Sequence, residues 1–384
     1  MLRKFEVRNY RNFKDKISLD FSDIGGYQFS TDCLYDGYIS KMLIYGRNAT
    51  GKTNLGNALM DIRKSLFGWR KSGESGSFLN ADSSEETAIF SYEFIFDGQK
   101  LLYQYARFAD ETLKWEKLEI NNEQIFSCDF SARQFDFDNL SYIKVETANT
   151  ERYRLSLDEE GESEDSDEIE LPFIRWLINN MALKKDSILL KLSNYVRRMI
   201  AISAGSGIRA RSGRMYNSFF ERLEEREGLQ DLEEFLNEMG IECQLVLRKL
   251  PDGQRELYFA HEKLVPFFET ASSGTLALFD IYRNLVIPLR NASFIYLDEF
   301  DAFYHYEMAE NVIRFFKKRY PKCQIIMTSH NTNLMTNRLM RPDCLFILSR
   351  FGTLTALCNA TERELREGHN LEKMYISGEF EKYE

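Results

Sequence analysis

The stretch "MLIYGRNATGKTNLGNAL", residues 42–59, runs from an apolar segment through a loop bounded by glycines into a helical pattern. Gly46, Gly51, Lys52 and Thr53 match the pattern GxxxxGK[ST], in which the glycines let successive backbone N–H groups converge on phosphate oxygens. Lys52 is placed to reach the β- and γ-phosphates, and Thr53 to offer its hydroxyl to Mg²⁺. Because the loop follows a strand and opens a helix, whose N-terminus favours negative charge, we predict a site for ATP or a related nucleotide with Mg²⁺.

The composition is that of an ordinary globular protein. Of the 384 residues, 43% are hydrophobic and 29% are charged, and a chain of this length can form two lobes or one domain with an insertion. No two of the six cysteines have CxxC spacing, so we expect reduced thiols and no zinc or disulfide framework. Neither a signal-peptide core nor a run approaching the ~20 apolar residues of a membrane span is present, which predicts a cytoplasmic protein.

Charge is unevenly distributed along the chain. The net charge is −10, and residues 158–170 carry acidic side chains and no basic one. Downstream, the segment from Lys184 to Arg214 is strongly basic, with Asp186 as its single acid. An acidic loop followed by a basic segment is typical of an interaction region. A mobile loop beside a solvated helix face explains the pattern equally well.

Hydrophobic patterning predicts an α/β fold with a mixed sheet, crossover helices and a helical insertion. The segment 41–45 is continuously apolar, as in a strand buried on both faces, and residues 87–126 alternate as in an antiparallel meander. From residue 275 onward, helical and strand patterns alternate, which indicates a parallel sheet. We therefore predict an N-terminal part of the ATPase domain over 1–150, a helical insertion over 151–240 and a C-terminal part over 241–384.

Two further strands end in polar residues that suit nucleotide chemistry. "FIYLDEFDAFYH", residues 294–305, ends its apolar run with Asp298 and Glu299 at the edge where an open parallel sheet binds ligands. Asp298 is expected to hold Mg²⁺ through water, and Glu299 to polarise the water that attacks the γ-phosphate. "IIMTSHN", residues 325–331, ends in Ser329 and His330. His330 is either a residue that hydrogen-bonds the γ-phosphate or attacking water, or a capping histidine on a surface turn.

A second helix start, in "ETASSGTLALFD" (residues 269–280), is rich in hydroxyl groups. Ser272, Ser273, Gly274 and Thr275 fit an ordinary N-cap. They also fit a second anion-binding helix N-terminus, with a glycine that admits a close phosphate. Since the P-loop already fills its own phosphate site, the second helix start is expected to face the nucleotide of another subunit.

These four elements, in this order, resemble the ABC-type ATPase heads of the RecF, SMC and overcoming-lysogenization group, and among them compact bacterial anti-phage defence ATPases. "VRNYRNF" resembles the opening of that group, "GRNATGKTN" its P-loop, "ETASSGT" its signature, "YLDEFDAFYH" its Walker B strand with D-loop, and "TSHNTNLM" its switch-histidine segment. The resemblance covers roughly residues 1–150 and 240–384. The ABC signature departs from "LSGGQ", and neither Gln104 nor Gln124 can be assigned as the Q-loop glutamine.

The resemblance implies a role for each matching residue. Glu299 would be the catalytic base and His330 the γ-phosphate sensor, with Asp301 as the D-loop residue at the dimer interface. Thr53 and Asp298 would support the metal, and Ser273 and Gly274 would contact the partner's γ-phosphate. The residues expected to contact the nucleotide from the chain's own side are Gly46, Asn48, Gly51, Lys52, Thr53, Asn54 and, near it, Arg11.

The resemblance further implies an ATPase that forms a homo-oligomer, at least a dimer, around ATP. As a sensor or scaffold subunit it would control a separate effector, such as a nuclease, during phage infection, with a phage-encoded trigger. The alternative is a RecF-like DNA-binding repair ATPase that uses the segment Lys184–Arg214 on the phosphate backbone. A transporter subunit is disfavoured by the meander and the long insertion.

Overall fold

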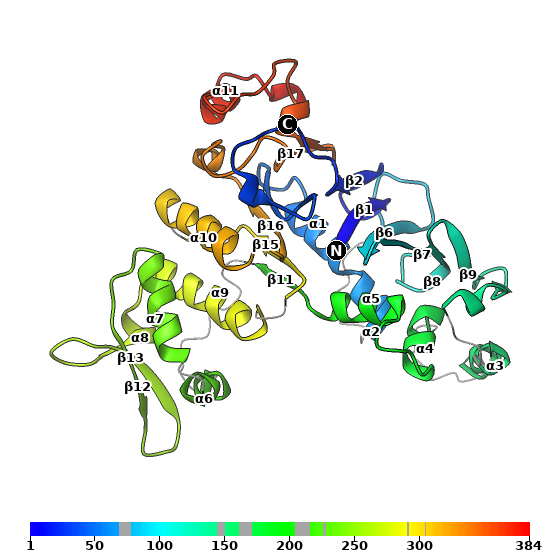
Figure 1. The fold of residues 1–384 in the computed structure, drawn as a ribbon, viewed down its shortest axis with the longest axis horizontal. Coiled ribbons are helices and arrows are strands. Elements are labelled where there is room, and N and C mark those ends of the chain that lie inside the picture. Colours follow the sequence, from blue (N-terminus) through cyan, green and yellow to red (C-terminus); the bar gives the residue numbers. More distant parts are fainter. Residues whose placement is uncertain are drawn as a thin grey trace.

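The fold contains two large sheets, a small one and helices between and around them (Figure 1). The computed structural model describes residues 1–68, 78–143, 150–160, 171–203, 216–225, 228–289, 292–303 and 305–384. Among these residues, no helix combines the length and the hydrophobicity that crossing a membrane requires.

The central sheet has the strand order β11-β15-β16-β5-β17-β18. The first five strands are parallel, and β18 is antiparallel to β17. Strand β5 lies inside the sheet and all five of its residues are buried, as its continuous apolar pattern predicts. The strand bounds are Lys41–Tyr45 (β5), Met199–Ser203 (β11), Phe294–Asp298 (β15), Gln324–Ser329 (β16), Leu345–Leu348 (β17) and Leu354–Ala356 (β18).

The second sheet is antiparallel and has the order β10-β9-β8-β7-β6-β1-β2. Strands β6 to β9 follow one another as neighbours, which confirms the predicted meander. The strand bounds are Leu2–Arg8 (β1), Ile17–Asp20 (β2), Ala88–Phe96 (β6), Gln99–Arg107 (β7), Leu113–Ile120 (β8), Glu123–Asp129 (β9) and Gln134–Asp136 (β10). A two-stranded sheet of Leu34–Tyr35 (β3) and Tyr38–Ile39 (β4) lies in the connection that leads to β5.

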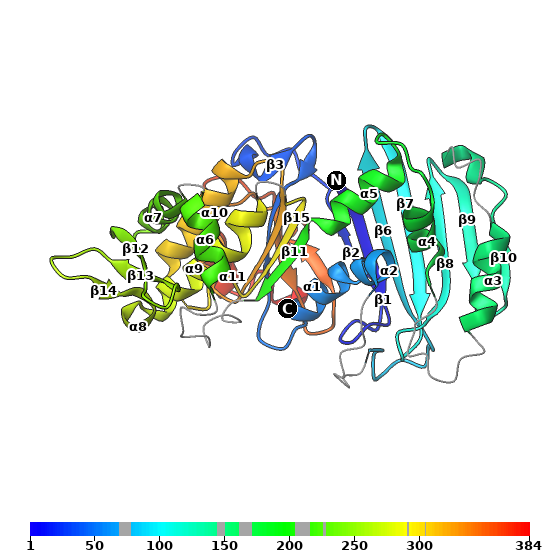
Figure 2. The same ribbon diagram turned by 90° about the horizontal axis from the view of Figure 1, so that it is seen from below.

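Helices α1 (Lys52–Met60) and α2 (Ile62–Phe67) lie between the two large sheets (Figure 2). From the antiparallel sheet, the Tyr92 hydroxyl donates to the Ala58 carbonyl at 2.6 Å, and the Tyr105 hydroxyl donates to Asp61 at 2.9 Å. From the central sheet, the Tyr296 hydroxyl donates to the Lys52 carbonyl. Hydrogen bonds from both sides therefore fix the helix that follows the glycine loop.

The prediction of a helical insertion over 151–240 is wrong in one respect. Helices α3 (Thr150–Glu160), α4 (Phe173–Asn180) and α5 (Ile188–Arg197) lead into β11, which pairs with β15 in the central sheet. Strand β11 is an edge strand whose residues alternate between more and less buried, so it lacks the continuous apolar run of its neighbours. The greater part of the acidic loop, residues 161–170, lies outside the described residues.

An outer lobe lies on the side of the central sheet that faces away from α1 (Figure 2). Its small sheet has the order β12-β13-β14, and its aromatic core joins α6, α8 and α9, for example through Phe219, Phe268 and Phe279. The predicted boundary at residue 240 falls inside this lobe. Its elements are α6 (Asn217–Glu225), α7 (Gly228–Glu238), β12 (Leu245–Lys249), β13 (Arg255–Phe259), β14 (Val265–Pro266), α8 (Phe267–Thr270) and α9 (Ser273–Leu289). The remaining helices are α10 (Tyr306–Arg319) and α11 (Leu371–Ile376).

Candidate nucleotide-binding site

The loop between β5 and α1 has the backbone of a phosphate-binding loop. Gly51 has a φ of 103° and Ala49 a φ of 66°, and such left-handed residues turn backbone N–H groups inward. A Cβ on Gly46 would lie 2.6 Å from the Thr50 hydroxyl oxygen and 3.2 Å from the Leu348 carbonyl oxygen, so a larger residue there would have to displace these neighbours. Helix α1 then begins at Lys52 and points its N-terminus at the loop.

The Lys52 side chain folds back over this loop and is buried. Its ammonium donates to the carbonyl oxygens of Gly46 at 2.7 Å and Arg47 at 3.1 Å, and lies 3.5 Å from a Glu299 carboxylate oxygen. The structure thus brings together the predicted phosphate-binding lysine and the predicted catalytic base, although they are far apart in the sequence.

A chain of hydrogen bonds joins α1 to two neighbouring strand ends. The Thr53 hydroxyl donates to one Asp298 oxygen at 2.6 Å, and the Thr328 hydroxyl donates to the other at 3.0 Å. The Thr328 oxygen also accepts from the Glu299 backbone N–H at 2.8 Å. The hydroxyl of Thr53 and the carboxylate of Asp298 are hard oxygen ligands of the kind that Mg²⁺ prefers, so this pair fits the predicted metal site.

Glu299 adopts a strained backbone conformation at the end of β15. Its φ is 49°, in the left-handed region that side chains larger than glycine rarely occupy. The turn lets consecutive residues serve different partners, because Asp298 contacts Thr53 while Glu299 reaches toward Lys52. The Glu299 side chain is 41% exposed, so water can reach its carboxylate.

Asp301, Ser329 and His330 meet where β16 ends. The Ser329 hydroxyl donates to one Asp301 oxygen at 2.7 Å, while the other oxygen is buried without a partner among the described residues. Burial raises the pKa of the Asp301 carboxyl, and the nearby His330 charge lowers it in part. His330 is exposed, which fits both a residue that meets a ligand and a histidine on a surface turn.

Arg11 lies beside the first turn of α1. Its guanidinium donates to the Asn54 side-chain oxygen at 3.0 Å, and the Asn54 amide in turn donates to Asn12. The Arg11 Nε atom is buried without a hydrogen-bond partner within the described chain. Asn48 is exposed at the tip of the loop. Arg11 and Asn54 are therefore joined to each other at the first turn of α1.

The predicted signature residues do not join this site. The Ser272 hydroxyl oxygen accepts from the Thr275 N–H at 3.1 Å, so Ser272 caps α9 as the simpler hypothesis predicts. Helix α9 packs against α7 in the outer lobe, whereas α1 packs against β11 and β15, on the other side of the central sheet (Figure 2). In the described part of the chain, no hydrogen bond links Ser273 or Gly274 to the P-loop. Ser273 is exposed.

Sequence reasoning missed two residues at this edge. Thr328 links Asp298 to Glu299, and its signal was a polar residue in an otherwise apolar strand. Ser203, at the end of β11, is paired with Asp298, and residues 204–215 that follow it lie outside the described residues. Both glutamines considered for a Q-loop lie in the antiparallel sheet, where Gln104 donates to Ser91 and Gln124 to Asp136.

A glycine loop between a buried strand and a helix, facing an acidic pair on a parallel strand, defines a P-loop ATPase fold. The family model described as "AAA domain, putative AbiEii toxin, Type IV TA system" matches residues 41–336, and the chain belongs to this family. The search of curated proteins found no match.

Several solved structures are similar in fold. One is an SMC head domain from Thermotoga maritima, with 13% identity, a TM-score of 0.48, and coverage of 92% of this chain and 98% of that one. Another is an SMC head bound to the C-winged helix domain of ScpA, with 15% identity, a TM-score of 0.48, and coverage of 92% and 96%. Similarity at this level does not bear on function.

Proposed function

We propose that the protein is an ATPase that binds ATP with Mg²⁺ and assembles with further copies of itself around the nucleotide. The observation that carries this proposal is the convergence of Lys52, Thr53, Asp298 and Glu299 from α1 and β15 at the mouth of the glycine loop. No other arrangement in the described residues presents a lysine, a hydroxyl and two carboxylates to one phosphate-binding loop.

In the proposed complex, backbone N–H groups of residues 46–51 and the Lys52 ammonium hold the β- and γ-phosphates. Lys52 is already directed into the loop, so its ammonium exchanges carbonyl oxygens for phosphate oxygens. Thr53 and Asp298 would hold Mg²⁺, which neutralises phosphate charge when it is bound. Arg11, Asn48 and Asn54 are placed around the same nucleotide.

For hydrolysis, Glu299 would accept a proton from the water that attacks the γ-phosphorus atom, and ADP leaves with the electrons of the broken P–O bond. Glu299 suits this role because its carboxylate lies 3.5 Å from Lys52 and remains accessible to water. His330, at the end of the adjacent strand, would donate a hydrogen bond to the γ-phosphate and report its presence.

The position of the signature residues supports an oligomer. Ser273 begins a helix in the outer lobe, away from the P-loop of its own chain, and is exposed, so it is proposed to reach the γ-phosphate of a second copy. Gly274, the other residue proposed for this contact, is buried in the single chain. Asp301, with one buried oxygen that has no hydrogen-bond partner among the described residues, is the proposed D-loop contact across the same interface. ATP would then close the interface and hydrolysis would open it, since only the γ-phosphate touches both copies.

We further propose that the oligomer is the sensor or scaffold subunit of an anti-phage system and controls a separate effector, such as a nuclease, in response to a phage-encoded trigger. The family description, which names a toxin of a toxin–antitoxin system, supports a role in a system of more than one component. So does the sequence likeness to compact defence ATPases, of which the AriA subunit of the PARIS system is an example.

The oligomer is tested with a Glu299→Gln variant, which keeps the ATP site and removes the base. We expect light scattering after size exclusion to give at least twice the monomer mass with ATP and Mg²⁺. A Lys52→Ala/Glu299→Gln variant serves as the matched control and should not respond to ATP. An identical mass with and without ATP, while ATP binding is demonstrated by calorimetry, would contradict the ATP-gated assembly.

A DNA-binding repair ATPase is the second candidate, because Lys184, Lys185, Arg197 and Arg198 are exposed around α5. Arg209, Arg211 and Arg214 of the same basic segment lie outside the described residues. Charge reversal of Arg197, Arg198, Arg209 and Arg211 should abolish a steeply salt-dependent affinity for duplex DNA. Absence of DNA binding by the unmodified protein at low salt would exclude this candidate.

A further inference from the structure

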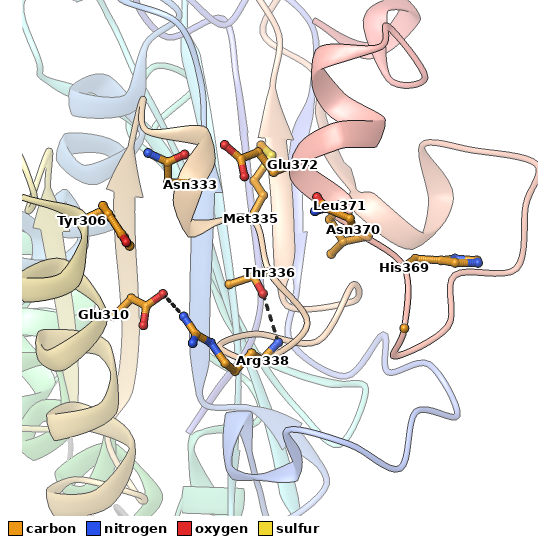
Figure 3. A pocket seen from close by; sticks show the side chains of 11 residues that line it. Tyr306, Glu310, Asn333, Met335, Thr336, Arg338, His369, Asn370, Leu371 and Glu372 are labelled. Carbon is orange, nitrogen blue, oxygen red and sulfur yellow. Dashed lines mark hydrogen bonds and ion pairs between the residues drawn. The ribbon is translucent and has the colours of Figure 1, made fainter.

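A pocket of about 510 Å³ opens beside the segment that follows β16 (Figure 3). Three segments form its walls: the first turns of α10, residues 333–338, and residues 368–372 near the C-terminal end of the described chain. Because much of its lining is charged or carries amide groups, the pocket differs from the mainly apolar cavities that bind small molecules and cofactors.

Two of these walls start from the nucleotide site. The segment 333–338 follows His330 by three residues, and α10 begins five residues after Asp301. Ser329 joins the two starting points, because its hydroxyl donates to Asp301 at 2.7 Å and its oxygen accepts from the Asn331 N–H at 2.9 Å. The chain segments that lead from His330 and Asp301 into two walls of the pocket are therefore joined through Ser329.

The wall formed by residues 368–372 is held by hydrogen bonds to the wall formed by residues 333–338. The Asn337 amide nitrogen donates to the carbonyl oxygens of Arg366 at 2.9 Å, Glu367 at 3.1 Å and His369 at 3.1 Å. Asn337 itself is buried. The loop before α11 is thus held by a residue of the segment that follows His330, so all three walls are connected to the strand ends of the nucleotide site.

The two ends of the pocket carry opposite charge. At one end, the buried Glu310 carboxylate pairs with both Arg338 and Arg314, so two guanidinium groups share one carboxylate. The Glu372 carboxylate and the Asn333 amide lie at the other end (Figure 3). Within the described part of the chain, neither of these two side chains has a hydrogen bond or an ion pair.

Glu372 lies in the first turn of α11, where the helix N-terminus favours a negative charge but supplies no side-chain partner. The Asn370 side-chain oxygen accepts from the Lys373 N–H at 2.8 Å and so caps α11 without Glu372. His369 accepts from the Arg366 N–H through Nδ1, and its ring points away from the pocket (Figure 3). Tyr306, 43% exposed at the rim, offers an aromatic surface to the stem of a long side chain.

We propose that this pocket is the docking site for a segment of a partner protein that inserts an arginine or lysine side chain against Glu372 and Asn333. Charge complementarity selects the occupant, since a half-buried carboxylate next to a free amide oxygen accepts the several N–H donors of a basic group. Arg338 at the opposite end favours an acidic residue in the same segment. Nucleotide dependence of this docking rests on the function proposed above.

The probe is a peptide selected from a random twelve-residue library displayed on yeast, with full-length Glu299→Gln protein, ATP and Mg²⁺ as bait. We expect the selected peptides to be enriched in arginine or lysine. By fluorescence anisotropy, Glu372→Gln should weaken the best peptide at least about tenfold, the loss expected for one hydrogen bond to a charged group. Glu362→Gln, the same change at an exposed position outside the pocket, should leave its affinity unchanged.

A second measurement separates direct contact from a general loss of charge. Replacing the basic residue of the peptide with citrulline should also lower the affinity for the unmodified protein about tenfold. The same replacement should cause no further loss of affinity for the Glu372→Gln variant. Peptides without enrichment of basic residues, or with affinity unaffected by Glu372→Gln, would overturn the proposal. Additive losses of affinity from the citrulline peptide and Glu372→Gln would also overturn the proposal. A Glu372→Gln variant with a changed ATP-dependent mass would overturn it too, because the pocket would then be a contact between copies.

The nucleotide dependence has its own readout. The affinity of the peptide for the ATP-loaded Glu299→Gln protein should differ severalfold from its affinity for the Lys52→Ala protein. Equal affinities would overturn the coupling of the pocket to the nucleotide site. If peptides fail while ATP still raises the mass of Glu299→Gln, the docking site is wrong and the ATP-gated oligomer stands. If the mass does not respond to ATP, the proposed function itself fails.

Discussion

Replacing Gly56 with alanine tests how closely the nucleotide-binding helix must pack on the strand that carries Asp298. Gly56 in α1 faces the ring of Tyr296 in β15, and a Cβ at this position would lie 2.5 Å from Cε1 and 2.6 Å from Cδ1 of that ring. Ordinary van der Waals contact begins near 3.4 Å, so helix and strand have to separate by about 0.9 Å. The ring cannot simply turn aside, because it is buried and its hydroxyl donates to the Lys52 carbonyl.

Two opposing effects determine the stability of this variant. Alanine favours the helix over glycine by about 1 kcal/mol, and overpacking a close contact costs about 1–3 kcal/mol. The free energy of unfolding should therefore fall by no more than about 2 kcal/mol, and the variant should remain folded.

Gly56→Ala should weaken nucleotide binding more than it lowers the stability of the fold. A separation of about 0.9 Å would stretch the 2.6 Å contact between Thr53 and Asp298 to about 3.5 Å, the limit of a hydrogen bond. Mg²⁺ demands near-ideal octahedral geometry at about 2.0–2.1 Å, so this change is large for a metal site. We expect the Mg²⁺-dependent affinity for ATP to fall about tenfold or more.

A fluorescent ATP analogue titrated at several Mg²⁺ concentrations measures this affinity, and urea denaturation measures stability. Asn57→Ala, at the next and exposed position of α1, is the control for an added alanine and should bind normally. Combining Gly56→Ala with Tyr296→Leu, which makes room for the methyl group, should recover part of the affinity. Normal ATP binding by Gly56→Ala together with unchanged or higher stability would refute the packing argument.

Two further changes have clear expected outcomes. Lys52→Ala should abolish nucleotide binding measured by calorimetry, since it removes the buried cation of the loop; unchanged affinity would refute the assignment of the site. Burial raises the pKa of Glu116 from 4.5 to about 7, although Tyr103 and the Phe173 N–H donate to it. The native state therefore keeps this proton to a higher pH than the unfolded chain does. The free energy of unfolding should fall by up to about 3 kcal/mol as the pH rises from about 4.5 to 7. The stability of Glu116→Gln, measured by urea denaturation, should lack this part of the pH dependence. If its stability falls with pH as steeply as that of the unmodified protein, the raised pKa of Glu116 is not the cause.

Local sequence patterns were sufficient for the elements that carry chemistry. Strand β5, the glycine loop and the start of α1 can be predicted because their residues are contiguous and each has a local signal. Asp298 and Glu299 follow from the same logic, since a continuous apolar run must end where polar side chains reach the sheet edge.

Features that depend on distant partners were not predictable in this way. Strand β11 has no continuous apolar run, and only its pairing with β15 makes it part of the central sheet. The outer lobe combines α6 and α7 with β12 to β14, although helical and strand patterns had suggested a boundary between them. The role of Thr328 depends on the neighbouring strand, because its hydroxyl acts on residues about 30 positions away.

The hydrogen bonds at the carboxyl edge of the central sheet also suggest how a bound nucleotide could act at a distance. Thr53 and Thr328 both donate to Asp298, and Ser329 donates to Asp301, so α1, β15 and β16 are tied together at their ends. Hydrogen bonds to charged groups contribute about 1.5–3 kcal/mol each, which makes independent movement of one strand end costly. A phosphate group held between Lys52 and His330 would therefore displace these ends together. Because α10 and the segment after His330 begin at the same ends, the displacement would reach both Asp301 and the walls of the pocket lined by Glu310, Arg338 and Glu372.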